Sequence, residues 1–185
     1  MLHGATPDGR PFGTAASAGA GVIGRDAVVL ALKNLLFTVL VPGTVAVYLP
    51  LAIAGGRDAA SGALLVLALV LFTAGGALYA WCVWDFATSG RGTPAPIDAP
   101  TRLVAEGPYR YVRNPMYVGV LAVISAWAVL LRSSVLLLYL GFVTTVFTLF
   151  VVLYEEPHLR RLFGEPYDAY CARVGRWFPR RCSRT

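Results

Sequence analysis

The sequence predicts an all-α, polytopic membrane protein with about four transmembrane helices, because apolar residues dominate it and collect in unbroken runs. Of its 185 residues, 57% are hydrophobic and 14% are charged, whereas an ordinary soluble domain carries about 25% charged residues. Unbroken apolar stretches of about 18 residues or more are typical of membrane-spanning helices. We therefore expect a flexible leader, residues 1–26, followed by a single membrane domain, residues 27–185.

The first two apolar runs each predict one crossing. The run at 35–54 contains Pro42 and Pro50, which predict a kinked helix. The run at 62–84 is uninterrupted and holds a cluster of small residues at 74–77. Such a cluster allows close approach of another backbone or of a ligand, and packing against a helix is the favoured explanation.

The last two runs predict a C-terminal helical hairpin, with helices at 114–131 and 135–154 joined by a tight turn at Arg132. The apolar part of the third run starts only at Tyr117 and would reach about 22 Å across a hydrocarbon core of about 30 Å. We therefore expect this helix to begin earlier, near Asn114, or the hairpin to tilt.

The basic residues predict the orientation in the membrane. Of the sixteen Lys and Arg residues, only Arg57 and Arg132 lie in the two short connections. The other fourteen precede the first run, lie in the central loop at 85–116 or follow the last run. The positive-inside rule therefore places both termini and this loop in the cytosol, in a protein of the cell's inner or plasma membrane. This distribution favours a membrane role over nucleic-acid binding.

The cysteines do not predict a metal site. Cys82, Cys171 and Cys182 are too few and too widely spaced for one. We interpret them as ordinary thiols, at least two of which face the reducing cytosol.

Two polar segments lie at the predicted cytosolic end of the hairpin. Residues 107–119 enter its first helix, and Glu155-Glu156-Pro157 leave its second. Because the hairpin is antiparallel, both segments lie at the same membrane face. Arg113 and Glu155 could therefore meet.

The two glutamates predict a positively charged partner. Adjacent carboxylates at a helix C-terminus face the negative end of the helix dipole, at a cost of about 0.3–1 kcal/mol each. We expect Arg113 or a cationic ligand to compensate Glu155 and Glu156, although a solvated helix end is the simpler alternative.

Three tyrosines, Tyr109, Tyr111 and Tyr117, lie within nine residues of one another. They could form an ordinary aromatic belt at the membrane interface. Aromatic faces also attract onium cations by roughly 0.5–2 kcal/mol, so a sulfonium cofactor would fit beside them.

The segment after the fourth run, 157–180, predicts two short amphipathic helices separated at Gly164. Aromatic and Arg residues together are typical of a membrane interface. The apolar set comprises Leu159, Leu162, Phe163, Tyr167, Tyr170, Val174, Trp177 and Phe178.

Residues of about 90–180 resemble a known family, the isoprenylcysteine carboxyl methyltransferase-like integral membrane methyltransferases, which are related to phospholipid N-methyltransferases. The resemblance rests on four motifs in the family's order. They are Leu103-Val104 before Gly107-Pro108-Tyr109, the segment Arg113-Asn114-Pro115-Met116-Tyr117-Val118-Gly119, Glu155-Glu156 after an apolar helix, and Phe163-Gly164-Glu165 with Tyr167, Tyr170, Trp177 and Pro179.

This resemblance implies S-adenosylmethionine-dependent methyl transfer at the cytosolic membrane face, to a lipophilic acceptor that enters from the bilayer. It implies Glu155 as the acidic residue of the reaction centre, with Arg113 and Glu156 as catalytic neighbours. The residues that it implies as cofactor contacts are Leu103, Val104, Tyr109, Asn114, Pro115, Met116 and Tyr117.

One departure concerns Asn114, which stands where the family commonly has histidine. An amide forms hydrogen bonds but does not titrate near neutral pH, so Asn114 cannot be a general base. A carboxylate or thiolate acceptor needs little base catalysis, whereas an amine or hydroxyl would need a proton removed, and Glu155 is the one family-implied group able to take it. We favour a carboxylate or thiol acceptor; a lipid amine remains open.

Two other functional classes remain as alternatives. Small membrane lipid reductases that use NADPH have a similar hairpin and aromatic-rich tail. A non-enzymatic scaffold or transporter is the second. The last three apolar runs carry no charge between their ends, which disfavours a transporter.

Overall fold

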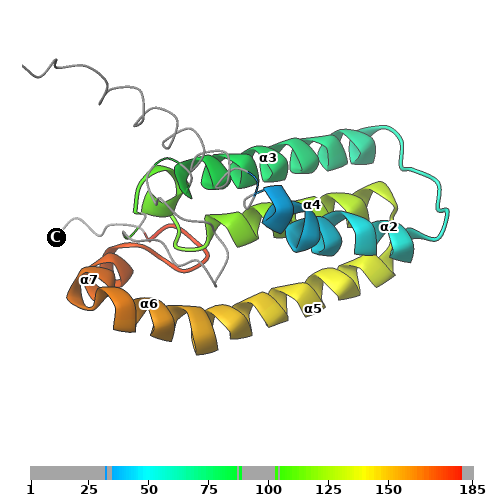
Figure 1. Ribbon diagram of the computed structural model, residues 1–185. Helices are drawn as coiled ribbons and strands as arrows, with labels where there is room; N and C mark the ends of the chain where they lie inside the picture. Colours follow the sequence, from blue (N-terminus) through cyan, green and yellow to red (C-terminus); the bar gives the residue numbers. More distant parts are fainter. Residues whose placement is uncertain (1–31, 33–34, 87, 89–102, 104, 181–185) are drawn as a thin grey trace, which may run out of the picture.

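A computed structural model describes residues 32, 35–86, 88, 103 and 105–180, and within these residues the regular secondary structure is helical (Figure 1). The all-α prediction is confirmed. The predicted leader, 1–26, lies outside the described residues.

The first membrane helix, Leu35–Ala54, contains a π turn, η1 (Thr44–Tyr48), followed by α2 (Leu49–Ala54). The amide of Leu49 donates to the carbonyl of Thr44, five residues back. Pro50 has no amide hydrogen and its ring would crowd the carbonyl four residues earlier, so the wider turn accommodates it.

Side chains from other helices donate hydrogen bonds to two backbone carbonyls of this irregular turn. The indole of Trp127 donates to the carbonyl of Ala46 at 3.0 Å, and the hydroxyl of Tyr139 donates to the carbonyl of Val45 at 2.8 Å. Ala46 is the residue whose carbonyl an amide at Pro50 would have bound. Since a bilayer offers no water to such carbonyls, these two bonds stabilise the interrupted helix.

Helices α3 (Ala63–Asp85) and α4 (Pro115–Leu130) pack most closely in the bundle. A Cβ at Gly75 would lie 2.7 Å from the carbonyl oxygen of Gly119, and a Cβ at Gly119 would lie 2.9 Å from that of Gly75. Only glycines allow the two backbones to come this close. The packing interpretation of the small-residue cluster is therefore confirmed.

Helix α4 is the central helix, because it also contacts η1 and α5 (Ser134–Phe150). The core between these three helices consists of Ala46, Val120, Ile124 and Val143. The hairpin turn places Arg132 at φ 45°, and the hydroxyl of Ser133 accepts from the amide of Leu136 to cap α5. The predicted hairpin is confirmed, and its first helix begins next to Asn114.

Helix α5 does not end near residue 154 as predicted. It continues through a π turn, η4 (Val151–Glu155), into α6 (Glu156–Phe163) (Figure 1). The amide of Glu156 donates to the carbonyl of Val151, five residues back, and this wide turn again precedes a proline, Pro157. Glu155 and Glu156 therefore lie inside a continuous helix, and the argument from a helix C-terminus is wrong.

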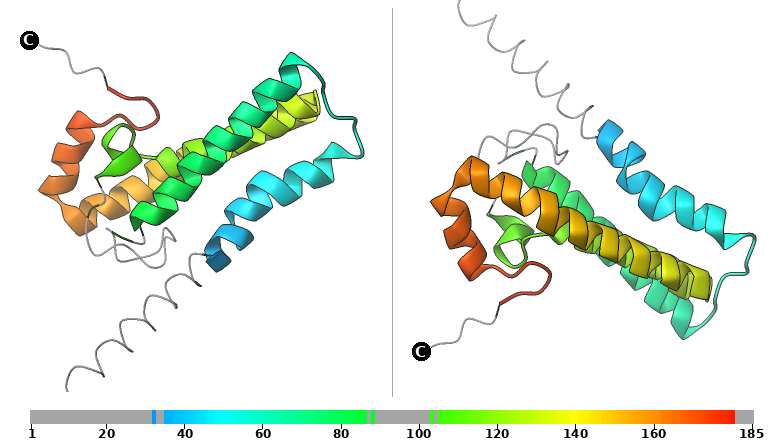
Figure 2. Two further views of the ribbon diagram at one scale, coloured as in Figure 1. Left: turned by 90° about the horizontal axis from the view of Figure 1, so that it is seen from above. Right: turned by 90° about the horizontal axis from the view of Figure 1, so that it is seen from below.

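The last described segments return to the bundle. Gly164, at φ 59°, separates α6 from α7 (Glu165–Arg173) as predicted. A tail, which we define as Val174–Arg180, then runs beside the short helix η3 (Gly107–Arg110) and the start of α4. Figure 2 shows α6, α7 and η3 at one end of the bundle and the turn between α4 and α5, in yellow-green, at the other.

Among the residues that the structure describes, three helices are long and apolar enough to cross a membrane, namely Leu35–Ala54, Ala63–Asp85 and Ser134–Phe163. Helix α4 is apolar but shorter. The protein is thus a multi-pass integral membrane protein, with α4 enclosed by its neighbours.

Candidate active site

Tyr117 and Glu155 join the two helices of the hairpin at the end remote from the Arg132 turn. Tyr117 lies in the first turn of α4, and its hydroxyl donates to Oε2 of Glu155 at 2.9 Å. Both side chains are partly buried. The ring of Tyr117 also packs against Phe147 of α5, with 4.7 Å between ring centroids. The predicted meeting of the two polar segments is therefore confirmed.

Glu156 faces a different set of partners. Its Oε1 lies 3.2 Å from Nη1 of Arg113 and 2.6 Å from Nε of Arg176. Nη2 of Arg176 donates to Oε2 at 2.9 Å, which makes that pair bidentate. The hydrogen bonds that Arg176 donates to Glu156 raise the pKa of Arg176, so this guanidinium stays charged.

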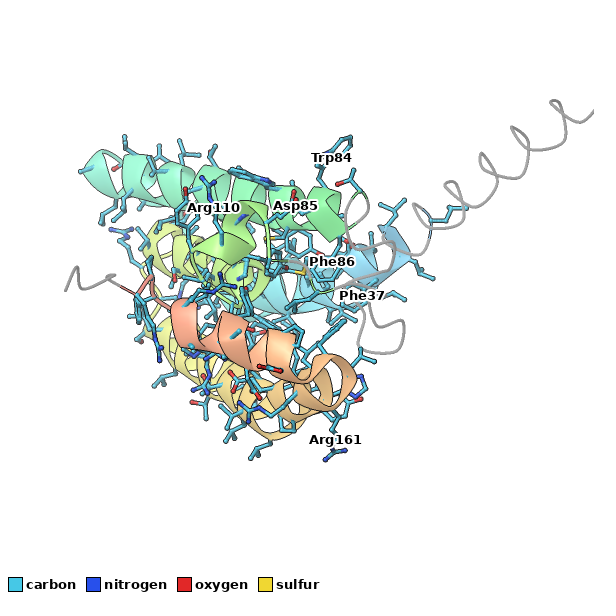
Figure 3. All side chains as sticks on the ribbon, turned by 90° about the vertical axis from the view of Figure 1, so that its left-hand side faces the viewer. Phe37, Trp84, Asp85, Phe86, Arg110 and Arg161 are labelled. Atoms are coloured by element: carbon cyan, nitrogen blue, oxygen red, sulfur yellow. The ribbon has the colours of Figure 1, made fainter. Side chains whose placement is uncertain are left out.

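The expected contact between Arg113 and Glu155 is corrected by this arrangement: the ion pair of Arg113 is with Glu156. Adjacent residues on a helix point about 100° apart, so only one of the two carboxylates can face the guanidinium. Arg161 is close in sequence, but Figure 3 shows its side chain pointing away from the bundle.

Glu155 differs from Glu156 in its electrostatic environment. Within the described part of the chain, every ion pair of the two glutamates is made by Glu156, and the partner of Glu155 is the neutral hydroxyl of Tyr117. A partly buried carboxylate without a cation is costly. A positively charged ligand would relieve that cost.

The tail is tied to the loop before α4 by backbone and side-chain bonds. The amide of Arg113 donates to the carbonyl of Gly175 at 2.8 Å, and Nδ2 of Asn114 donates to the carbonyl of Arg176 at 3.2 Å. A Cβ at Gly175 would overlap the carbonyl oxygen of Phe178, so the tight turn here requires glycine. Asn114, only 6% exposed, thus holds the tail through its amide.

Tyr109 and Met116 pack against α3. Tyr109 is buried against Cys82, with Met116 and Phe86 packed around them. The carbonyl of Tyr109 accepts from the hydroxyl of Tyr170 at 2.7 Å. Burial raises the pKa of Tyr170, so it remains a neutral donor. This contact fixes η3 against α7.

The remaining residues that the resemblance implied are distributed over several surroundings. Pro115 is fully buried at the start of α4, and Leu103 packs against the cluster of Tyr167 and Tyr170. Val104 lies outside the described residues. Of the implied cofactor contacts that are described, Tyr117 is the one that forms a side-chain hydrogen bond with Glu155.

Tyr111 does not join the site. It is exposed, and the guanidinium of Arg110 lies over its ring, 4.6 Å from the centroid. Figure 3 shows Arg110 on η3, near the end of α3 that carries Asp85. The three tyrosines therefore have three different environments.

Sequence reasoning missed two contributors to this site. From the sequence, Arg176 is one of the basic residues and Trp177 belongs to the apolar set and to a family motif, but neither is assigned to the site. In the structure Arg176 binds Glu156, and the ring of Trp177 lies 6.4 Å from that of Tyr117. The sequence feature that could have indicated them is that Arg176 and Trp177 are adjacent and follow Gly175. A short turn at this glycine can bring a positive charge and an aromatic ring to the same place.

A family model described as phospholipid methyltransferase matches residues 63–166, more than half of the chain. The chain belongs to the phospholipid methyltransferase family. This methyltransferase depends on S-adenosylmethionine, and its family indicates a lipid acceptor. The matched segment runs from α3 into α7 and contains Tyr117, Glu155 and Glu156. Comparisons with curated proteins and with solved structures return no match.

The residues around Glu155 fit the charge of S-adenosylmethionine. The carboxylate has no cationic partner within the described part of the chain, and Tyr117, whose ring packs on Phe147, lies beside it. Aromatic faces and carboxylates both attract onium cations. The family assignment favours methyl transfer over the reductase and the non-enzymatic alternatives.

Proposed function

We propose that this methyltransferase is isoprenylcysteine carboxyl methyltransferase-like and methylates the carboxylate or thiol of an isoprenoid-like or other lipid acceptor at the cytosolic membrane face. The motifs at 107–119 and at Glu155-Glu156 support the subfamily, and they lie together at one end of the hairpin. The apolar surroundings of this end support a lipophilic acceptor.

The hydrogen bond between Tyr117 and Glu155 carries the proposal. It holds a carboxylate at the end of an apolar helix bundle, where the charge of Glu155 is not neutralised by an ion pair within the described residues. Such a carboxylate is suited to act on a cationic donor or on a proton of the acceptor. We therefore assign the reaction centre to Glu155.

The chain's own residues align and shield the reaction. When bound, S-adenosylmethionine supplies an electrophilic methyl group on a sulfonium, whose carbon–sulfur bond breaks as the acceptor's oxygen or sulfur bonds to the methyl carbon. Tyr117 fixes the direction of the Glu155 carboxylate. Arg113 and Arg176 hold Glu156 and so fix the helix that carries both glutamates. A rigid, dry arrangement of this kind is the main contribution that a protein makes to methyl transfer.

The possible acceptors differ in whether they must lose a proton. A carboxylate is already deprotonated and needs no base, whereas a thiol must lose its proton. Asn114 cannot accept that proton, and its amide already binds the tail. Glu155 can accept it, so both acceptors are compatible with the residues present.

The other implied cofactor contacts have supporting roles in this proposal. Asn114 and Pro115 set the backbone at the start of α4, and Tyr109 and Met116 fix the preceding loop against α3. Leu103 supplies apolar contacts on the side of α7, and we keep Val104, which lies outside the described residues, as a proposed cofactor contact. We place both termini in the cytosol because the basic residues concentrate there.

The test is to supply the purified, detergent-solubilised protein with S-adenosylmethionine carrying a labelled methyl group and with lipid fractions. We expect label in a lipid product. Mild alkali distinguishes the products, because it releases labelled methanol from a methyl ester and leaves a methyl thioether or N-methyl amine intact. Label found only in phospholipid amines would reject the proposed acceptor class, and no label in any lipid would reject methyl transfer to lipids.

A further inference from the structure

Trp177 lies beside the proposed reaction centre although it comes from the other end of the chain. Its ring makes an edge contact with that of Tyr117, at 6.4 Å between centroids and 72° between planes. Tyr117 in turn donates to Glu155. Two aromatic side chains, one from α4 and one from the tail, are thus grouped near one carboxylate.

The tail is anchored on the N-terminal side of Trp177. The carbonyl of Gly175 accepts from the amide of Arg113, and the carbonyl of Arg176 accepts from Asn114. The side chain of Arg176 binds Glu156 through two hydrogen bonds, at 2.6 and 2.9 Å. Consecutive anchors immediately before Trp177 leave its backbone little freedom.

The neighbour of Trp177 shows how selective this placement is. Phe178 is 81% exposed, whereas Trp177 is partly buried and packs on Tyr117. Two adjacent aromatic residues therefore have opposite environments. Simple anchoring at a membrane interface would not require Trp177 to face inward.

We propose that Trp177 forms the aromatic wall of the S-adenosylmethionine site next to Tyr117, where it favours the positive charge of the sulfonium, and that Arg176 is the positioning residue that holds it there. This inference rests on the proposed function. Its physical basis is that rings of Trp attract onium cations more strongly than those of Tyr or Phe, and that the nearby Glu155 has no ion pair within the described residues.

The first test compares binding of two cofactors by calorimetry. S-adenosylmethionine carries the sulfonium charge, and S-adenosylhomocysteine lacks it. We expect Trp177→Ala to weaken S-adenosylmethionine binding by about 2- to 30-fold, the range of one cation–π contact, and to weaken S-adenosylhomocysteine binding much less. Phe178→Ala is the matched control and should bind both cofactors as the wild type does.

The second test uses tryptophan fluorescence of the same proteins. Addition of S-adenosylmethionine should change the emission of the wild type. Trp177→Phe should remove most of that change while keeping the fold, and Trp84→Phe, at an exposed position on α3, should leave it intact. An unchanged signal in Trp177→Phe would overturn the assignment of Trp177.

The third test concerns Arg176. Arg176→Gln should raise the KM for S-adenosylmethionine about tenfold with a smaller change in kcat, because the wall moves while Arg113 still binds Glu156 and Tyr117 still binds Glu155. Arg176→Lys should restore part of the loss, since it keeps the charge but not the two parallel bonds. Arg173→Gln, an exposed arginine of α7, is the control and should behave as the wild type.

The outcomes separate the two proposals. If the wild type binds no S-adenosylmethionine, the proposed function fails. If the wild type binds it and Trp177→Ala binds both cofactors as tightly, or loses both equally, only the wall at Trp177 is rejected. If Arg176→Gln and Arg173→Gln have the same KM, Arg176 is not a positioning residue.

Discussion

The hydroxyl of Tyr117 donates a hydrogen bond to the carboxylate of Glu155 across the hairpin, 38 residues further along the chain. One partner lies in the first turn of α4 and the other in the π turn that follows α5. The pair therefore links the start of α4 to the π turn between α5 and α6. Two predictions depend on this hydrogen bond.

Glu155→Gln should reduce turnover by about 100-fold or more, the usual contribution of an acid–base group or of one electrostatic contact in the reaction centre, with little change in fold. The amide keeps an oxygen that can accept from Tyr117 but loses the charge. Rates of labelled methyl transfer and a thermal unfolding curve measure the two effects. Glu165→Gln, on the exposed start of α7, is the control. Turnover near the wild-type rate in Glu155→Gln would reject the assigned role.

Tyr117→Phe should lower kcat about tenfold or more while S-adenosylmethionine still binds. The variant keeps the ring that packs on Phe147 and removes only the donor to Glu155. A hydrogen bond to a charged group is worth about 1.5–3 kcal/mol, and its lower bound corresponds to about tenfold. Tyr111→Phe, at an exposed position, should have no effect. Equal kcat values in the two variants would contradict the prediction.

Gly75→Ala should destabilise the protein by about 1–3 kcal/mol, the range for overpacking a tight contact. The added methyl group would lie 2.7 Å from the carbonyl oxygen of Gly119, which is backbone and cannot move aside. Gly76→Ala is a matched control, because no atom lies within 4 Å of a Cβ there. Unfolding in detergent measures both variants, and similar midpoints would mean that α3 and α4 are further apart than described.

Trp127→Phe should cost about 0.5–1.5 kcal/mol through the loss of the indole hydrogen bond to the carbonyl of Ala46. Pro50→Ala supplies a backbone amide that can bind the same carbonyl, so Trp127→Phe should cost less in that background. A double-mutant cycle isolates this coupling from the edge contact that Trp127 makes with Phe72. Additive effects would show that the two groups do not share the carbonyl.

The helices could be predicted from the sequence because their signal is local. Unbroken apolar runs placed Leu35–Ala54 and α3 within one or two residues, and the turn at Arg132 defined the hairpin. The continuation of α5 into α6 could not be predicted, because Pro157 is equally typical of the first turn of a new helix. Only the tertiary structure shows that a π turn accommodates it.

The candidate site could be predicted as a region but not in its pairings. An antiparallel hairpin brings Arg113 and the two glutamates to the same end, however each helix is rotated about its own axis. The choice between Glu155 and Glu156 depends on helix phase, which the π turn alters. Arg176 meets Glu156 only because Gly164 and the turn at Gly175 return the tail to the bundle, and such a return has no local pattern.

The π turn at Val151–Glu155 has a consequence for how this helix tolerates insertions and deletions. A π turn contains one residue more than an α turn. The extra residue rotates the directions of all following side chains about the helix axis by up to about 100°. As a result, the charged face of α6 points in a different direction from the exposed apolar face of α5, although α5, η4 and α6 form one continuous helix. Loss of a single residue here would exchange the directions of neighbouring side chains, and point substitutions should be tolerated far better than any change in length.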